Sequence, residues 1–458
     1  MRSLMTTLQQ NATLQPEGVA LVGPNLTLNT LELFESAKAA LSWLLNSGVK
    51  SGDLVAMRLT SETECVILAA LDGIGATASI IRFQEQINNL SKWGFTHLVV
   101  NEAVDAPRDV KVLKLLPSSL APGPKTQTQS FHKWLDDEPY RVLTTSGTTG
   151  HSKAVALTMR QFEYRVKRAR DGWHQVEPYF GLLGLDATVS QVALTRSIRD
   201  SRPFFITGTP EHCAQIVSNW GIRSVTGTQA QLEQLFEAQK SRQFSLTRVV
   251  VPGSYPTAGF QSTIRRRMPE LEIFVGFGST ESGQVFFGEA NPEVQAFETT
   301  MPELELTVVD PEQPLRTDLT QGLLGIRGPG VASAYLGEQD SLAFSPRKGW
   351  FFPGDFVSIK PDGVVTLLGR ANDVINFKGL KLNPSKVEEL LERLIPGSEF
   401  LVSHVADKLE INYVAAAQID EESVAALIGK EFGIPGPFVL NKRVSIPTNH
   451  SGKKVRHR

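Results

Sequence analysis

The chain has 458 residues, too many for one compact core, and this length fits two or three domains. Apolar residues make up 41% and charged residues 21%, as in an ordinary globular protein, and the net charge of −2 provides no global field that would favour nucleic acid or an anionic membrane. The N-terminus has no long apolar run and no stretch reaches about 18 uninterrupted apolar residues, so we expect no signal peptide, no membrane span and a cytoplasmic protein.

Strands and helices are predicted to alternate over roughly the first 275 residues. Apolar residues recur at helical spacing over 28–48 and stop at Gly48, residues 54–59 predict a strand, and residues 65–76 predict a second helix. Further strand-like segments are HLVV, VLTTS, FFIT, IRSVTG and TRVVVPGS, at 97–100, 142–146, 204–207, 222–227 and 247–254. This alternation predicts an α/β domain with largely parallel sheets.

The pattern changes after residue 304. Short strands with intervening turns predict a small β-rich subdomain over about 304–368, with a hairpin turn at PDG, 361–363. After Arg370 the sequence predicts a short strand, a helix at 384–394, a strand at 411–417 and a helix at 421–433. This last part has the length of a small α+β domain.

A loop rich in Ser, Thr and Gly, Thr144–Lys153 (TTSGTTGHSK), directly follows the strand-like RVL. Small residues leave backbone N–H groups open, hydroxyls add donors, and Lys153 adds a positive charge, which together suit a polyphosphate. The spacing is not that of a Walker A loop. Taken alone, such a loop is more often a simple turn.

Three further segments have residue types that suit a nucleotide. In GFGSTESG, Phe277 could stack on a purine, Thr280 could bind phosphate and Glu281 could bind Mg²⁺, a cation that prefers oxygen ligands. In GWFFPGDF, Asp355 could accept two hydrogen bonds from a ribose diol, and in LLGRAND, Arg370 offers a planar set of donors. Taken singly, plain turns explain the first two segments equally well. A fifth segment, the C-terminal SGKKVRHR, is by itself best interpreted as a solvated basic tail.

The order and spacing of these five segments resemble the adenylate-forming superfamily of acyl- and aryl-CoA ligases, peptide-synthetase adenylation domains and luciferases. GLLGIRGPGVASAYLG, at 322–337, resembles a further element of that family, and the resemblance extends from about residue 26 to the C-terminus. It implies a large N-terminal domain over 1–369 that includes the β-rich subdomain, a hinge at 370–373 and a small mobile lid domain over 374–458.

The resemblance also assigns roles to individual residues. Lys453, directly after Gly452, is the implied catalytic lysine, with Thr280 and Glu281 contributing to catalysis and Glu281 to Mg²⁺ binding. The implied ATP contacts are Ser146, Gly147, Thr148, Thr149, Gly150, Lys153, Gly253, Phe277, Gly278, Asp355 and Arg370. Gly276 and Gly283 are implied at the acid substrate, and Lys378 and Gly379 on the path of an incoming thiol.

The implied reaction is activation of a carboxylic acid by ATP and Mg²⁺ to an acyl-adenylate, with release of pyrophosphate. Thioester formation with coenzyme A follows, or with the pantetheine of a carrier protein acting in trans, because this chain shows no carrier domain. One alternative is transfer of the acyl group to an amine or another non-thiol acceptor. The other is a non-catalytic nucleotide-binding protein, against which the retained Lys453, Glu281 and Asp355 count.

The chain departs from the family pattern at several positions. The phosphate loop has Ser152 and Ala154 where Pro and Gly are usual, and Leu323, Ala334, Pro353 and Asn372 replace usual residues of later elements. None of these departures removes a charged group from the chemistry, but together they indicate a divergent member.

Asp186 has two competing interpretations. The segment LDATVS, 185–190, resembles the element in which peptide-synthetase adenylation domains place an Asp against the α-ammonium group of an amino-acid substrate. Asp186 could do the same here, because a carboxylate in an apolar pocket requires a cation. The alternative is that Asp186 caps the following helix, as Asp commonly does.

Overall fold

The computed structural model describes residues 3–120, 130–145, 152–171, 176–240, 242–291, 295–297, 303–310, 320–332, 335–338, 349–371, 375–377, 380–395, 397–405, 408–415, 419–434 and 438–447. The chain forms two compact units. The first comprises Met1–Gly253, Gly276–Val285 and Gly328–Gly349, and the second comprises Ser254–Val275, Phe286–Arg327 and Trp350–Arg458.

A six-stranded sheet lies in the first unit, in the order β6-β5-β3-β4-β7-β8. Its strands are β3 (Leu54–Arg58), β4 (Thr77–Ile80), β5 (His97–Val100), β6 (Lys111–Lys114), β7 (Pro139–Thr145) and β8 (Lys153–Thr158). Neighbouring strands are parallel from β6 to β7, and β8 alone runs antiparallel, with Thr145 opposite Lys153. The expected phosphate loop therefore connects the last two strands of this sheet.

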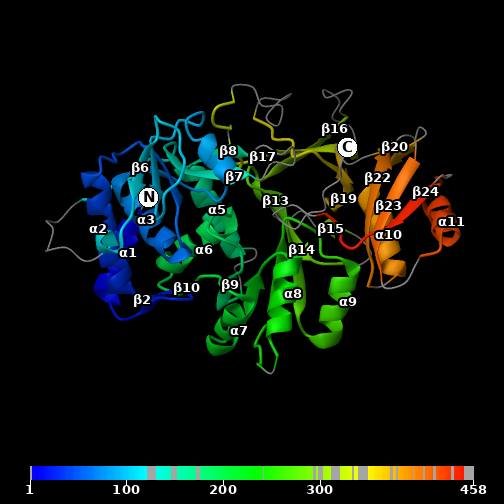
Figure 1. Cartoon of the computed structure of the whole chain (residues 1–458), viewed down its shortest axis with the longest axis horizontal. Helices are drawn as coiled ribbons and strands as arrows, with labels where there is room; N and C mark the ends of the chain where they lie inside the picture. The colour runs from blue at the N-terminus through cyan, green and yellow to red at the C-terminus, as the bar shows by residue number, and fades with distance from the viewer. Residues whose placement is uncertain are drawn as a thin grey trace. The chain divides into compact units, whose positions relative to one another are not determined.

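Helices α1 (Leu4–Leu14), α2 (Thr30–Asn46) and α3 (Ser61–Ile74) pack against one another beside these strands (Figure 1). Asn29 and Glu32 form a capping box at the start of α2: each side chain accepts a hydrogen bond from the other residue's backbone N–H, at 2.8 and 2.9 Å. Gly48 then takes a positive φ of 96° just after the helix. The helices predicted at 28–48 and 65–76 are confirmed, although α3 begins earlier, at Ser61.

A second, largely parallel sheet has the order β14-β13-β12-β11-β9, and β9, β11 and β12 run parallel. Its strands are β9 (Tyr179–Gly181), β11 (Ser224–Thr226), β12 (Arg248–Pro252), β13 (Glu272–Ser279) and β14 (Gly283–Glu289). Helix α5 (Met159–Asp171) contacts β7 and β8 of the first sheet, and α6 (Thr188–Arg199), α7 (Pro210–Asn219) and α8 (Gln229–Ala238) follow along the chain. A small sheet of β10 (Phe204–Phe205), β1 (Val19–Val22) and β2 (Thr27–Asn29) and the short helices α4 (Gln84–Asn88) and η1 (Pro117–Leu120) also belong to the first unit, whereas β13 and β14 each have residues in both units. The predicted α/β class with parallel sheets is confirmed.

The second unit contains the predicted β-rich part as an antiparallel sheet, in the order β15-β19-β18-β17-β16. Its strands are β15 (Ala296–Phe297), β16 (Glu305–Val309), β17 (Gln321–Arg327), β18 (Asp355–Ile359) and β19 (Val365–Arg370), and helix α9 (Ala258–Arg267) belongs to the same unit. The predicted PDG turn connects β18 to β19, with Gly363 donating to the carbonyl of Lys360 at 2.9 Å. Its φ of 86° explains why glycine stands there.

The C-terminal residues of the second unit pack around their own apolar cluster, which runs from Phe377 to Ile434. The elements are β20 (Ile375–Phe377), β21 (Leu380–Leu382), α10 (Pro384–Leu394), β22 (Glu399–Val405), β23 (Lys408–Val414), α11 (Glu421–Phe432) and β24 (Phe438–Lys442). Asn383 and Asp420 cap the two helices with their side chains. Both predicted helices and the α+β character are confirmed, whereas the domain boundary and hinge at 370–373 stay predictions.

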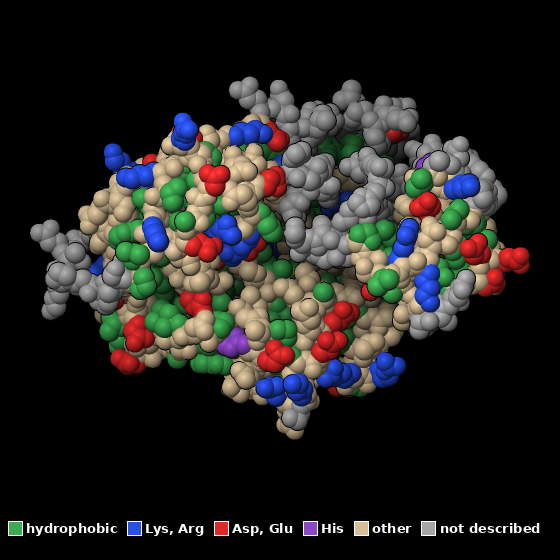
Figure 2. Space-filling view, viewed as in Figure 1, with side chains coloured by type: hydrophobic (Ala, Val, Ile, Leu, Met, Phe, Trp, Pro, Cys, Tyr) green, Lys and Arg blue, Asp and Glu red, His purple; other side chains and the backbone are tan. Residues whose placement is uncertain are grey.

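Charged side chains of both signs are scattered over the face seen in Figure 2, in keeping with the small net charge. Among the helices that the structure describes, none is both long and apolar enough to span a bilayer.

Candidate active site

The turn between β13 and β14 carries Thr280 and Glu281. Two serines close it reciprocally: the backbone N–H of Ser279 donates to Ser282 Oγ at 3.1 Å, and that of Ser282 donates to Ser279 Oγ at 3.2 Å. The turn therefore holds its own shape through the short polar side chains on either side of the two predicted catalytic residues.

Glycine is required on both sides of this turn. A Cβ on Gly278 would lie 2.0 Å from the backbone oxygen of Gly283, which no side chain can tolerate. Gly283 itself has a φ of 68°, in the region that favours glycine. These two positions were predicted as cofactor and substrate contacts, and the structure shows that each also has a backbone reason to be glycine.

Arg165, on α5, holds this turn by hydrogen bonds to its backbone. Its guanidinium donates to the backbone oxygens of Thr280 and Glu281, each at 2.8 Å, and to that of Gly330 at 2.8 and 3.0 Å. Only 6% of the residue is exposed, and this burial lowers the pKa of the guanidinium to about 9, which still leaves it charged at neutral pH. Arg165 thus fixes two separate segments of the chain with one planar group.

Tyr335 links the predicted Mg²⁺ residue to the predicted phosphate lysine. The Tyr335 hydroxyl donates to Glu281 Oε1 at 2.6 Å, and Lys153 Nζ lies 4.5 Å from the centre of the Tyr335 ring. Burial and the nearby Glu281 carboxylate both raise the pKa of Tyr335, so its proton stays in place. Lys153 also pairs with Glu338 at 3.6 Å. The structure therefore brings Lys153 and Glu281 together, although 128 positions separate them in the sequence (281 minus 153).

Three other predicted residues lie on the same sheet. Phe277 is partly exposed on β13, and Gly253 follows β12 directly. The backbone N–H of Gly253 donates to the oxygen of Gly276 at 3.1 Å, so Gly253, just after β12, lies beside Gly276 on β13. Their proposed contacts with adenine and substrate stay predictions.

Asp355 and Arg370 meet in the second unit. They stand opposite each other where β18 and β19 pair, and Arg370 Nε lies 3.1 Å from Asp355 Oδ1. Asp355 is 7% exposed, while 39% of the Arg370 side chain remains exposed. Asp355, the residue predicted to bind ribose, therefore already forms an ion pair with Arg370, another of the predicted ATP contacts.

Asp186 does not cap helix α6. The N-cap is Ala187, which makes no side-chain cap hydrogen bond, so the capping interpretation is wrong. Instead Arg82 Nε donates to Asp186 Oδ1 at 3.0 Å, and the same guanidinium pairs with the buried carboxylate of Glu64. Asp186 therefore already has a cationic partner, Arg82, which it shares with Glu64.

The remaining predicted site residues lie outside the described part of the chain: Ser146, Gly147, Thr148, Thr149, Gly150, Asn372, Lys378, Gly379 and Lys453. Three functional candidates were missed from the sequence: Arg165, Tyr335 and Glu338. Tyr335 lies within the GLLGIRGPGVASAYLG element, and that position could have indicated a role in the site. No sequence pattern indicated Arg165 or Glu338.

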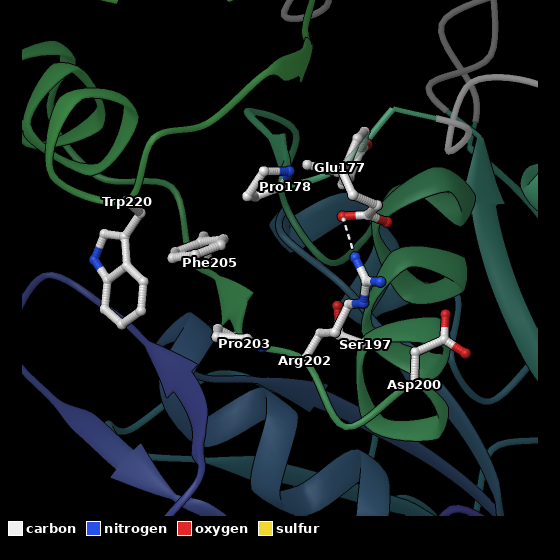
Figure 3. Close-up of a pocket in the computed structure, with 9 residues that line it drawn as sticks. Glu177, Pro178, Ser197, Asp200, Arg202, Pro203, Phe205 and Trp220 are labelled. Carbon is white, nitrogen blue, oxygen red and sulfur yellow. Dashed lines mark ion pairs between the residues drawn. The ribbon is translucent and has the colours of Figure 1, made fainter. Parts of the chain in front are cut away.

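A pocket of about 370 Å³ in the first unit is separate from these residues (Figure 3). Phe205 and Trp220 form an apolar wall, and Arg202 faces Glu177 at 3.7 Å across from it. Burial raises the pKa of Glu177. The pocket has no predicted phosphate or ribose contact among its described lining residues, so it is not the expected nucleotide site.

Comparison with known proteins agrees with the geometry. A family model described as AMP-binding enzyme matches residues 8–336. The 2-succinylbenzoate–CoA ligase of Bacillus licheniformis is 24% identical over 98% of this chain and 98% of its own. The o-succinylbenzoate CoA synthetase of Bacillus subtilis, solved with an acyl-adenylate intermediate, superposes with a TM-score of 0.82 at 18% identity over 99% of this chain and 97% of its own. An amide bond synthetase of Marinactinospora thermotolerans superposes with a TM-score of 0.83 at 19% identity over 98% of both chains. Both solved structures share the fold.

Proposed function

The chain belongs to the family of AMP-binding enzymes, and we propose that it is an ATP-dependent acid–thiol ligase that passes through an acyl-adenylate. A carboxylate oxygen of the substrate attacks the α-phosphorus of ATP, the bond from that phosphorus to the bridging oxygen breaks, and pyrophosphate leaves. A thiolate then attacks the acyl carbon, and AMP leaves with the electron pair of the broken acyl–oxygen bond.

The observation that carries this proposal is the meeting of Lys153 and Glu281 around Tyr335. The first step brings two anions together, so the site must neutralise charge that shifts toward pyrophosphate. Lys153 supplies a positive charge beside the Tyr335 ring. Glu281, which accepts the Tyr335 hydroxyl, supplies a carboxylate that can bind a cation. A polyphosphate with bound Mg²⁺ needs both a positive group for its oxygens and a carboxylate for the metal ion.

Mg²⁺ fits as a companion of ATP. Within the described ranges no group of three or more His, Cys, Asp or Glu side chains could hold a metal ion. Mg²⁺ commonly binds through one or two carboxylates together with substrate phosphates, and Glu281, oriented by Tyr335, offers such a carboxylate. The role of the protein is then to place this oxygen and to keep Lys153 at the leaving phosphates.

Coenzyme A, or the pantetheine arm of a carrier protein acting in trans, is the proposed thiol. Support comes from relatives that are named as CoA ligases and align along nearly the whole chain. Lys378 and Gly379 are proposed on the thiol path and Lys453 as the lysine of the first step, with the segment after residue 373 turning about the proposed hinge between the two steps. The cytoplasmic location stays a prediction.

The proposal is tested by ATP–pyrophosphate exchange with purified protein across a panel of fatty, aryl and amino acids. We expect exchange that depends on one class of acid, and with coenzyme A a thioester product identified by mass spectrometry. Exchange without a thioester, but with an amide when amines are supplied, would favour the non-thiol acceptor. A protein that binds ATP but exchanges with no acid would contradict the enzymatic function.

Asp355→Ala is expected to weaken ATP binding by about 2–3 kcal/mol, or roughly 30- to 150-fold, because a charge-assisted pair of hydrogen bonds to the ribose is lost. Calorimetric titration with ATP measures the change. Asp362→Ala is the matched control, since Asp362 is exposed in the PDG turn of the same hairpin. An affinity for ATP within threefold of wild type would show that Asp355 does not bind the nucleotide.

Asp186→Ala distinguishes amino acids from other acids as substrates. If Asp186 binds an α-ammonium group, the variant loses exchange with an amino acid but retains exchange with the deaminated analogue. Only the amino acid carries an ammonium group that needs the Asp186 carboxylate as its partner. Asp200→Ala, at the end of α6, serves as the control for removal of an exposed carboxylate. If the wild type is active only with acids that lack an amine, Asp186 does not bind substrate and serves only as the ion-pair partner of Arg82.

A further inference from the structure

The short helix α4 contacts both ends of the expected phosphate loop. At one end, Gln86 Nε2 donates to Thr144 Oγ1 at 2.8 Å. At the other end, the Glu85 carboxylate accepts two hydrogen bonds from Ser152, from its backbone N–H at 2.8 Å and from its hydroxyl at 3.0 Å. Two consecutive residues of one helical turn therefore hold the chain on either side of the loop.

Glu85 fixes a position that strand pairing does not reach. The last paired residues of β7 and β8 are Thr145 and Lys153, so Ser152 is the first residue on the loop side of the pairing. Both oxygens of Glu85 bond to Ser152, one to the backbone and one to the side chain. A residue bonded in both ways cannot rotate without breaking a charge-assisted hydrogen bond. A proline at this position could make neither bond, because it has no N–H and no hydroxyl.

The helix that carries Glu85 is itself firmly held. The Gln86 side-chain oxygen accepts hydrogen bonds from the backbone N–H groups of Arg82, at 2.7 Å, and Phe83, at 3.1 Å. Gln86 is 4% exposed and Ile87 is fully buried. Arg82 is in turn fastened by its ion pairs with Glu64 and Asp186. The anchor of Ser152 thus extends through α4 to the end of β4.

From this geometry we propose that Glu85 is a positioning residue for ATP, which acts by holding Ser152 and, through it, the end of the phosphate loop next to Lys153. This inference rests on the proposed function, in which the loop binds the phosphates of ATP. A negatively charged residue beside an anion-binding loop is unfavourable by charge alone, and the two bonds to Ser152 are the reason for it to stand there.

The test compares Glu85→Ala, Glu85→Gln and Ser152→Ala in the full-length protein. We expect the KM for ATP to rise about tenfold in Glu85→Ala, since two hydrogen bonds that order the loop are lost. Glu85→Gln keeps one carbonyl acceptor and should show a smaller increase. The KM for the acid should stay within twofold, because the loop is proposed to contact ATP and not the acid. Gln84→Ala is the matched control on the same helix: among the residues that the structure describes, the Gln84 side chain bonds to Asn88 and to the backbone oxygen of Asp105.

A double-mutant comparison separates positioning from loss of fold. Because Glu85 acts through Ser152, adding Ser152→Ala to Glu85→Ala should leave the KM for ATP within about twofold of the Glu85→Ala value. Additive effects of the two changes would overturn the proposal. An equal loss for ATP and for the acid, or a similar loss in Gln84→Ala with a lowered melting temperature, would also overturn it.

Direct calorimetry with MgATP keeps this inference distinct from the proposed reaction. If the wild type binds ATP but exchanges with no acid, the reaction is wrong, and the affinities of the Glu85 variants still decide the positioning role. An ATP affinity that is unchanged in Glu85→Ala refutes that role. A wild-type protein that binds no ATP refutes both.

Discussion

Replacing Lys453 with alanine should reduce acid-dependent ATP–pyrophosphate exchange by at least about a hundredfold, while ATP binding stays within about threefold of wild type. Lys453 is proposed to bridge the substrate carboxylate and the α-phosphate, so it acts mainly as charge moves toward pyrophosphate. Removing a group that stabilises such a transition state typically raises the barrier by about 3–4 kcal/mol. Initial rates of exchange and calorimetric affinities for ATP measure the two effects separately.

The chain supplies a matched control for this experiment. Lys454 is the next residue, with the same charge and the same place in the basic C-terminal segment. Lys454→Ala should leave exchange within about threefold, because a general effect of the basic tail would be screened and weak. Equal losses in the two variants would show that the tail acts by its net charge and that Lys453 has no special role.

Glu281→Gln should lower the maximal exchange rate by a hundredfold or more and raise the Mg²⁺ concentration needed for half of that rate. The amide keeps an oxygen that can accept the Tyr335 hydroxyl, and the bonds from Arg165 go to the backbone, so the turn stays in place. What disappears is the negative charge offered to the cation. A Mg²⁺ titration of the initial rate is the measurement.

Tyr335→Phe separates orientation of the carboxylate from its charge. This variant keeps the ring beside Lys153 but removes the hydrogen bond to Glu281, so we expect a loss of about tenfold, smaller than that of Glu281→Gln. Thermal melting should be close to wild type in both variants. If Glu281→Gln retains activity within threefold at low Mg²⁺, the proposed metal role is wrong.

Local patterns predicted the regular elements well, because periodicity, caps and turns are properties of neighbouring residues. Helix α10 has the predicted bounds, 384–394, and the capping box of α2 uses residues three positions apart. The same local reasoning failed at Asp186. A carboxylate before a helix suggests a cap, but a cation from a segment 104 positions away holds the side chain elsewhere.

The sequence by itself determined the class of the fold and the family, and it supplied most of the residues proposed for the site, because the segments that carry them are short and each has its own chemical composition. Only the tertiary structure showed what holds those residues in place. Nothing in α5 distinguishes Arg165 from its basic neighbours Lys167 and Arg170, yet those two are exposed and Arg165 is buried on carbonyl oxygens 115 to 165 positions away. Glu85 and Ser152 likewise meet across 67 positions. A buried charge needs partners that only the folded chain provides, and for that reason the supports of this site could not be read from any local pattern.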